Sequence, residues 1–365
     1  MNKTLHTGKN TKWVSYENPA VKNIRQENAK GVKRTGAKRT LFFDSRPKIT
    51  GCAAVVSTRE KEGPLGKYFR HIETDETLKQ KTFENAEIKM LEKALKSAIR
   101  GAKLRDSDID MLLSGDLMNQ LTSSSYVARK LALPYMGLYS ACSTMTQCLA
   151  LGASLVNAGY FDNVACATGS HFATAERQFR FPLEYGCQRP PYAQWTVTGA
   201  GCSIISRDGD GPSITAATIG KAIDFGIKDL SNMGAAMAPA AFDTLSALFR
   251  DTGTEACDYD MIVTGDLGKL GSDIFRDLMY GEGHYMGQNY CDCGAIIYDR
   301  NQKCYQGGSG AGCSAAVFNS FIMERLWNKS INKVVFLATG ALMSNTSSYQ
   351  GESIPAISHA VIIEN

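Results

Sequence analysis

The sequence predicts an α/β protein made of two similar halves, and two repeated motifs support this prediction. The segment Asp110–Leu117 reads DMLLSGDL, and Asp260–Leu267 reads DMIVTGDL 150 residues later. In each half a Cys-Ser pair, at Cys142 and at Cys313, stands 25 residues before an Ala-Thr-Gly triplet. Agreement in both residue identity and spacing is typical of a tandem duplication, so we expect one α/β unit to occur twice.

Strands and helices are expected to follow the same order in both halves. In the first half, apolar runs predict strands at 50–57, 111–113, 135–141, 164–168 and 202–206, and apolar spacings predict helices at 83–99, 124–133 and 144–158. In the second half, strands are predicted at 214–218, 261–264, 334–338 and 360–363, with helices at 242–250, 272–279 and 315–327.

This alternation predicts mostly parallel sheets with helices packed on their faces. Two pseudo-symmetric βαβαβαββ halves, 49–209 and 210–365, would stack through shared helices into a five-layered αβαβα sandwich. Because duplicated halves of this size share one core, we expect a pocket at the seam between them.

Charge is distributed unevenly along the chain. Residues 1–48 hold 12 Lys/Arg and 3 Asp/Glu, whereas the remaining residues hold 28 and 33. This basic arm lacks apolar periodicity, so we expect it to be flexible. It could be a solvated tail, contact an anionic membrane surface or bind nucleic acid. The last option lacks arginine–aromatic interleaving and a recognition-helix pattern, so no nucleic-acid partner is expected.

Targeting and cofactor signals are weak. The sequence has no apolar run long enough for a transmembrane helix and no stretch that resembles a signal peptide. Most of its 11 cysteines lie in apolar segments, which is typical of reduced thiols in an intracellular protein. A set formed by His284, Cys291, Cys293 and Cys304 does not match the spacing of a structural zinc site. We therefore predict no resident metal or cofactor.

Cys142 is the first candidate for chemistry, because it ends a predicted strand and opens a predicted helix between the small residues Ala141 and Ser143. Amides at a helix N-terminus favour a thiolate, so this is a plausible position for a nucleophile. The alternative is a small buried hydrophobic residue at the seam.

The repeated strand–Cys–helix–strand–Gly pattern resembles the thiolase fold of thiolases and ketoacyl-carrier-protein synthases. In that family the first-half cysteine is acylated, and a His and an Asn of the second half assist it. Here the His position is Asp266, the Asn position is Gly312 and the late glycine run reads GALMS at 340–344. A carboxylate would raise the pKa of the thiol, and groups of this kind act as a unit. The resemblance therefore implies no acyl transfer. The alternative is an acyltransferase or ketoacyl-synthase-like enzyme with Cys142 as its nucleophile.

A second resemblance covers nearly the whole chain. It rests on GPLG at 63–66, GDLMNQ at 115–120, SACST at 140–144, ATAERQFR at 173–180, MGAAMAPAA at 233–241 and GGSG at 307–310. These segments are similar to the stage V sporulation protein AD family of spore-forming bacteria. The resemblance implies a thiolase-like fold without thiolase activity that binds dipicolinic acid, alone or as its calcium chelate, for uptake during sporulation and release at germination. It also implies a homodimer that lies peripherally on the spore inner membrane, with other stage V sporulation protein A components as partners.

Dipicolinate is a planar dianion, so its site needs hydrogen-bond donors. Arg177 and Arg180, expected in a loop at a strand end, suit carboxylate geometry, but surface ion pairs are the alternative. Asp116 and Asp266 end equivalent strands, would face one another across the seam and could bind calcium carried by the ligand or cap helices.

Three further residues complete the expected ligand site. Asn119 could hydrogen-bond the ligand or lie in a turn, and Cys142 would line the pocket floor. His171 is placed at the pocket, and His171 and His284 could also act as substitute bases for Cys142, although a lone His is more often structural.

Overall fold

Two five-stranded sheets with the same strand order form the core. The computed structural model describes residues 38–179 and 190–365. Of the expected basic arm, 1–48, residues 1–37 lie outside these ranges. The first sheet consists, in spatial order, of β5 (Tyr135–Gly137), β4 (Met111–Gly115), β6 (Asn163–Ser170), β8 (Gly199–Ser206) and β2 (Lys48–Ser57). The second repeats this order with β11 (Tyr290–Asp292), β10 (Met261–Thr264), β13 (Lys333–Ala341), β14 (Ala356–Glu364) and β9 (Ser213–Thr218).

Short strands extend these sheets. The two sheets meet where Lys48 pairs with Ser213, so they form one continuous ladder. Two edge strands, β1 (Thr40–Phe42) and β3 (His71–Glu73), pair with β9 and β2. A separate two-stranded sheet joins β7 (Trp195–Thr196) to β12 (Gly308–Ser309). Since β8 ends at Ser206 and β9 begins at Ser213, the boundary that we place at 209/210 falls in the turn between them.

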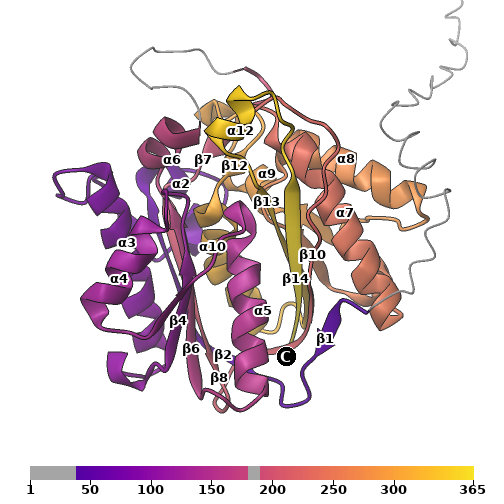
Figure 1. Ribbon diagram of the computed structural model, residues 1–365. Helices are drawn as coiled ribbons and strands as arrows, with labels where there is room; N and C mark the ends of the chain where they lie inside the picture. The colour runs from indigo at the N-terminus through magenta and orange to yellow at the C-terminus, as the bar shows by residue number, and fades with distance from the viewer. Residues whose placement is uncertain (1–37, 180–189) are drawn as a thin grey trace, which may run out of the picture. The chain divides into compact units, whose positions relative to one another are not determined.

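Helices cover and separate the two sheets. The helices that form the three helical layers are α3 (Phe83–Gly101), α4 (Thr122–Leu131), α5 (Thr144–Asn157), α7 (Met233–Thr252), α8 (Gly268–Gly281) and α10 (Ala311–Val317). The other helices are α2 (Thr58–Lys61), α6 (Phe172–Phe179), α9 (Cys293–Ile297), α11 (Met323–Trp327) and α12 (Asn345–Tyr349). Figure 1 shows α5 and α10 between the sheets, with α3 and α4 outside the first and α7 and α8 outside the second. The predicted five layers, αβαβα, are confirmed.

The apolar pattern explains this layering. Along β2, Ala54 and Val56 pack into the central cluster around α5 and α10, whereas Ala53 and Val55 pack into the outer cluster beneath α3. Neighbouring strand residues point to opposite faces, so a strand covered by helices on both sides is apolar throughout.

None of the helices in the described part of the chain is long and apolar enough to cross a membrane.

The strands are less uniformly parallel than the sequence predicts. Within each five-stranded sheet two strand pairs are parallel. The other two pairs are antiparallel, namely β6–β8 and β8–β2 in the first sheet and β13–β14 and β14–β9 in the second. A connection between adjacent antiparallel strands starts and ends at the same edge of the sheet. The segments that follow β6 and β13 therefore stay at the edge where these strands end, and residues 175, 179, 341 and 343 of these segments line the cavity described below.

Several predicted elements differ from the structure, and the helix predicted at 242–250 extends from Met233 to Thr252. Residues 172–179 form helix α6 where a loop was expected, because His171 Nδ1 accepts a hydrogen bond from the Ala173 amide at the start of the helix. The strand predicted at 135–141 ends at Gly137, and the chain then enters a 3₁₀ turn at Ala141–Ser143. The helix predicted at 315–327 contains a π-helical turn at Phe318–Ile322 between α10 and α11.

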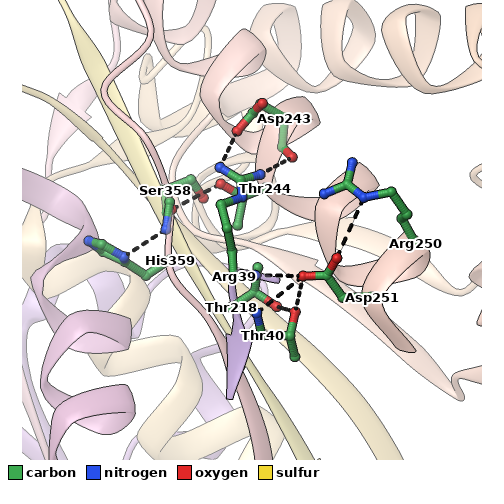
Figure 2. A network of polar contacts seen from close by, with 10 residues as sticks. Arg39, Thr40, Thr218, Asp243, Thr244, Arg250, Asp251, Ser358 and His359 are labelled. Carbon is green, nitrogen blue, oxygen red and sulfur yellow. Dashed lines mark hydrogen bonds and ion pairs between the residues drawn. The ribbon is translucent and has the colours of Figure 1, made fainter. Parts of the chain in front are cut away.

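A polar network fastens the first described residues to α7. The backbone amides of Arg39 and Thr40 both donate to Asp251, at 2.9 and 3.1 Å, as Figure 2 shows. The Arg39 guanidinium also bonds the side chain of Asp243 at 2.6 Å and its carbonyl oxygen at 2.8 Å. The start of β1 is thereby fixed to an outer helix of the second half.

Candidate functional site

Cys142 lies in a strained turn just before α5, as the sequence predicts, but β5 ends at Gly137 instead of running up to the cysteine. The preceding residue, Ala141, has a left-handed φ of 50°, which is uncommon for a residue with a side chain. Such strain persists only where the surrounding structure enforces it, and it is concentrated at binding and catalytic sites. The Cys142 side chain is 6% exposed.

The second half of the chain holds this turn in place. Ser143 Oγ donates to the carbonyl oxygen of Ala338 at 2.9 Å, and Ser314 Oγ donates to that of Cys142 at 3.4 Å. A Cβ atom at Gly340 would overlap the carbonyl oxygen of Ser140, so β13 approaches the turn more closely than any side chain allows. The seam between the halves therefore passes directly beneath Cys142.

Asp266 lies behind the thiol and accepts donors from several segments. One carboxylate oxygen accepts the Gly310 amide at 2.9 Å and Ser309 Oγ at 3.1 Å, and the other accepts Thr339 Oγ1 at 3.0 Å. The Cys142 thiol is also hydrogen-bonded to this carboxylate. Asp266 is fully buried, and each of these donors stabilises its ionised carboxylate as a hydrogen-bond acceptor.

The electrostatics of this pair oppose formation of a thiolate. Burial raises the pKa of the Cys142 thiol, and the charge and hydrogen bond of Asp266 raise it further. The Gly310 amide and the Ser309 hydroxyl lower that pKa only in part. Burial also raises the pKa of Asp266, to about 6. The thiol is therefore neutral at physiological pH.

A second buried carboxylate fixes the loop that carries Asp266. Asp292 accepts the amides of Leu267 and Gly268, each at 2.9 Å, and the Thr264 hydroxyl at 2.7 Å. Burial raises the pKa of Asp292 to about 7, and the neighbouring charge of Asp266 adds to this effect. A side chain from another segment also holds this loop, because Gln194 Nε2 donates to the carbonyl oxygen of Asp266 at 2.6 Å.

A cavity opens above Cys142. The cavity itself is small, at about 30 Å³, and it opens to solvent. Its described lining is mostly apolar, with a few polar groups, and comprises Leu117, Tyr139, Ala141, Cys142, Ala175, Glu176, Phe179, Thr196, Met233, Ser309, Gly310, Ala341 and Met343. An outer groove that includes Asn119 shares four of these residues, Leu117, Tyr139, Phe179 and Met343. A mostly apolar cavity with a few fixed polar groups is the usual form of a small-molecule site.

Asp116 and Asp266 accept hydrogen bonds from different groups. Its carboxylate accepts the Met118 amide at 3.0 Å, and the Ser124 amide and hydroxyl at 2.8 and 2.6 Å. These contacts hold the turn before α4 and the first turn of that helix, as a capping carboxylate does. Within residues 38–179 and 190–365, no group of three or more His, Cys, Asp or Glu side chains is arranged to hold a metal ion.

The other predicted site residues lie at different distances from the cavity. Asn119 lies in the outer groove, where its Oδ1 accepts Gln178 Nε2 at 2.9 Å. His171 is buried beside α6 rather than at Cys142, and its Nε2 bonds the carbonyl oxygen of Glu76 at 2.9 Å. Arg177 pairs with Glu84 at 2.8 Å on the outer side of α6. Arg180 lies outside the described residues.

Position 312 leaves no room for a side chain. A Cβ atom at Gly312 would overlap the carbonyl oxygen of Gly199 and lie 2.7 Å from Ser170 Oγ. The Gly312 amide donates to the same Ser170 Oγ at 3.0 Å. This backbone packing does not accommodate an asparagine.

Sequence reasoning missed the donors that surround Asp266. Ser309 and Gly310 belong to the glycine-rich segment at 307–310, and Thr339 belongs to the repeated Ala-Thr-Gly triplet. Both motifs were visible in the sequence. Their contact with Asp266 depends on three segments that are distant along the chain.

The fold and the cysteine turn define a class of protein. The structure is similar to 3-oxoacyl-[acyl-carrier-protein] synthase III from Aquifex aeolicus VF5, with a TM-score of 0.55 and 12% identity over 87% of this chain and 100% of that chain. It is also similar to a C143S form of Xanthomonas campestris OleA with bound lauric acid and lauroyl-CoA, with a TM-score of 0.58 and 13% identity over 88% and 99%. At these identities the likeness establishes the fold alone, which is thiolase-like.

Sequence comparison is more specific. The stage V sporulation protein AD family matches residues 37–364. The stage V sporulation protein AD of Bacillus subtilis (strain 168) is 43% identical over 333 residues, which cover 91% of this chain and 98% of that protein. The chain belongs to the stage V sporulation protein AD family and is a sporulation protein.

Proposed function

We propose that the chain is a non-catalytic binding protein for dipicolinic acid, alone or as its calcium chelate, in uptake during sporulation and release at germination. Membership of the sporulation family supports the setting. The resemblance of its motifs to that family implies the ligand. The cavity above Cys142 is the site that we assign to it.

The observation that carries the non-catalytic part is the contact between Cys142 and Asp266. A thiol nucleophile needs a partner that takes its proton or stabilises its anion. Here the partner is a buried carboxylate that raises the thiol pKa, and position 312 has no room for a side-chain amide. The same surroundings leave a mostly apolar cavity, in which Glu176 is the one carboxylate of the described lining, and apolar walls suit the ring of a planar aromatic ligand.

Calorimetry with dipicolinate tests this proposal. Ala175 lies on α6 and lines the cavity, so Ala175→Leu is expected to fill the cavity and reduce affinity at least tenfold. The exposed residue Ala222 provides a matched control, and Ala222→Leu is expected to bind as the wild type does. Titrations with and without calcium separate the free acid from its chelate. No heat of binding in the wild type, or equal binding by both variants, would contradict the site.

The second candidate is an acyltransferase that uses Cys142, and the strained turn at Ala141 favours it. Incubation with acyl-coenzyme A, followed by intact mass measurement, distinguishes the two functions. We expect no adduct on Cys142 for any acyl chain length. A Cys142 adduct that forms in the wild type and not in Cys142→Ala would establish the enzyme.

Partners are part of the same proposal. We expect a homodimer, and the edge strand β5 is the candidate interface because Met136 and nearby Tyr139 are exposed there. Light scattering after size exclusion checks this, with Met136→Lys expected to shift the mass toward the monomer. We also propose that the chain acts with other stage V sporulation protein A components at the spore inner membrane. Its basic arm would contact an anionic surface there. Salt-sensitive liposome binding that survives removal of residues 1–37 would exclude the arm.

A further inference from the structure

The floor of the cavity consists of neutral groups that cover a carboxylate. Cys142, Ser309 and Gly310 line the cavity, and Asp266 lies immediately behind them without exposure to solvent. Each of the three is in hydrogen-bond contact with Asp266. A ligand that rests on this floor is therefore separated from a buried carboxylate by a single layer of atoms.

The groups that face Asp266 offer it no positive charge. The titratable groups that interact with the charge of Asp266 include the thiols of Cys142, Cys293 and Cys313 and the carboxyl of Asp292. Glu176 is the other carboxylate that lines the cavity. Within the described part of the chain, the contacts of the Asp266 carboxylate are with hydroxyl, thiol and amide donors rather than with Lys, Arg or His.

An anion above this floor and an ionised Asp266 below it would repel one another strongly, since the protein interior between them screens charges poorly. We propose that an anionic ligand binds in this cavity together with one proton, which neutralises Asp266. This inference rests on the proposed function, because it takes the ligand to be a carboxylate such as dipicolinate. Binding is then proton-coupled, with a proton taken from solvent and held on the Asp266 carboxyl.

Protonation also changes what the floor can donate. In the ionised state Ser309 Oγ donates to Asp266 at 3.1 Å. A neutral carboxyl is a weaker acceptor than a carboxylate, so the Ser309 hydroxyl becomes free to rotate toward a carboxylate of the ligand. The same proton thus removes a repulsion and supplies a donor. Burial, which places the pKa of Asp266 at about 6, makes this exchange accessible near neutral pH.

The test is calorimetry with dipicolinate between roughly pH 5.5 and 8, where the free ligand stays ionised, in buffers of different ionisation enthalpy that count protons. The wild type is expected to take up as much as one proton per ligand. Its affinity should fall by up to about tenfold per pH unit above the pKa of Asp266. In Asp266→Asn, proton uptake should approach zero and the affinity should become independent of pH.

Control variants assign the proton. Glu87→Gln removes a buried carboxyl outside the cavity, which Ser123 and Thr174 hold, and should leave proton uptake unchanged. Glu176→Gln tests the other lining carboxylate, because proton uptake that survives this change belongs to Asp266 and uptake that is lost belongs to Glu176. Ser309→Ala removes a donor that stabilises the carboxylate, so the pH midpoint should rise while affinity at low pH falls. If circular dichroism shows that Asp266→Asn does not fold, the shift of the pH midpoint in Ser309→Ala tests the proton coupling in its place.

The outcomes separate the two proposals. Absence of dipicolinate binding at every pH contradicts the proposed function. Binding with an affinity that does not change with pH leaves that function intact and overturns the proton coupling. Proton uptake that persists in Asp266→Asn, or is lost in Glu176→Gln, overturns the assignment to Asp266.

Discussion

Cys142 is hydrogen-bonded to a carboxylate rather than to an imidazole, and this contact decides how reactive the thiol is. Burial and Asp266 both raise its pKa, so little thiolate exists at neutral pH. Among the described cysteines Cys257 is exposed, which makes it an internal reference for the same reagent.

We predict that iodoacetamide at pH 7 labels Cys257 at least tenfold faster than Cys142, because only a thiolate in contact with solvent reacts. Peptide mass spectrometry over a time course measures both rates in one sample. Asp266→Asn should speed the labelling of Cys142 by removing the negative charge. Labelling of Cys142 as fast as Cys257 in the folded wild type would contradict the assigned electrostatics.

The absence of a side chain at position 312 gives a prediction about stability. Gly312→Ala should lower the free energy of unfolding by about 1–3 kcal/mol, because the new methyl group overlaps backbone atoms of β8. Urea unfolding measures the change. Gly281→Ala, at a helix end with nothing within 4 Å of the added atom, is the control and should change stability by less than about 0.5 kcal/mol.

At the scale of elements, single carboxylates fasten separate segments to one another. Asp116 holds the turn before α4, Asp292 holds the loop that carries Asp266, and Asp251 holds β1 to the end of α7. Each accepts several donors, so removal of one leaves buried or partly buried donors without a partner. The contact of Asp251 (Figure 2) is the simplest to test, because neither Asp251 nor the residues that it bonds line the cavity.

Asp251→Ala should increase amide exchange in β1 and lower the free energy of unfolding by about 1–3 kcal/mol. The amides of Arg39 and Thr40 and the Thr40 hydroxyl all lose their acceptor. Hydrogen exchange followed by mass spectrometry reports on this strand directly. Arg250→Ala removes only the ion pair of Asp251 with this exposed arginine, at 3.5 Å, and should have little effect. Unchanged exchange in β1 of Asp251→Ala would show that the network does not hold it.

At the scale of the whole molecule, the two halves share buried acids at their seam, and this affects stability against pH. Burial raises the pKa of Asp266 from 3.8 to about 6, so the folded state holds that proton more tightly than the unfolded chain does. The resulting stabilisation is fully present below pH 3.8 and is lost as pH rises through about 6. His359 acts in the opposite direction, since burial lowers its pKa to about 4.

A comparison of the wild type with Asp266→Asn therefore isolates the contribution of Asp266 to the pH dependence of stability. The stability of wild type relative to Asp266→Asn should fall by about 2 kcal/mol between pH 4 and pH 7. Urea midpoints at several pH values measure this difference, and the contribution of His359 is common to both proteins. A difference that stays constant, or that grows with pH, would mean that Asp266 titrates near its ordinary value.

The sequence by itself determined the duplication, the order of the strands and helices, the five layers and the pairing of a cysteine position with an aspartate position. The duplication, the element order and the layers follow from repeats and apolar spacing, which act over short distances along the chain, whereas the pairing of Cys142 with Asp266 follows from the resemblance to the thiolase fold. The resemblance of its motifs also identified the family that the comparisons confirm.

Only the tertiary structure decided what surrounds those residues. It placed Ser309, Gly310 and Thr339 around Asp266, kept side chains out of position 312, and assigned His171 and Arg177 to the supports of α6. The physical reason is that a buried carboxylate takes its donors from whichever backbone packs against it. That backbone comes from strands and turns tens to hundreds of residues away, whose contacts no local pattern encodes.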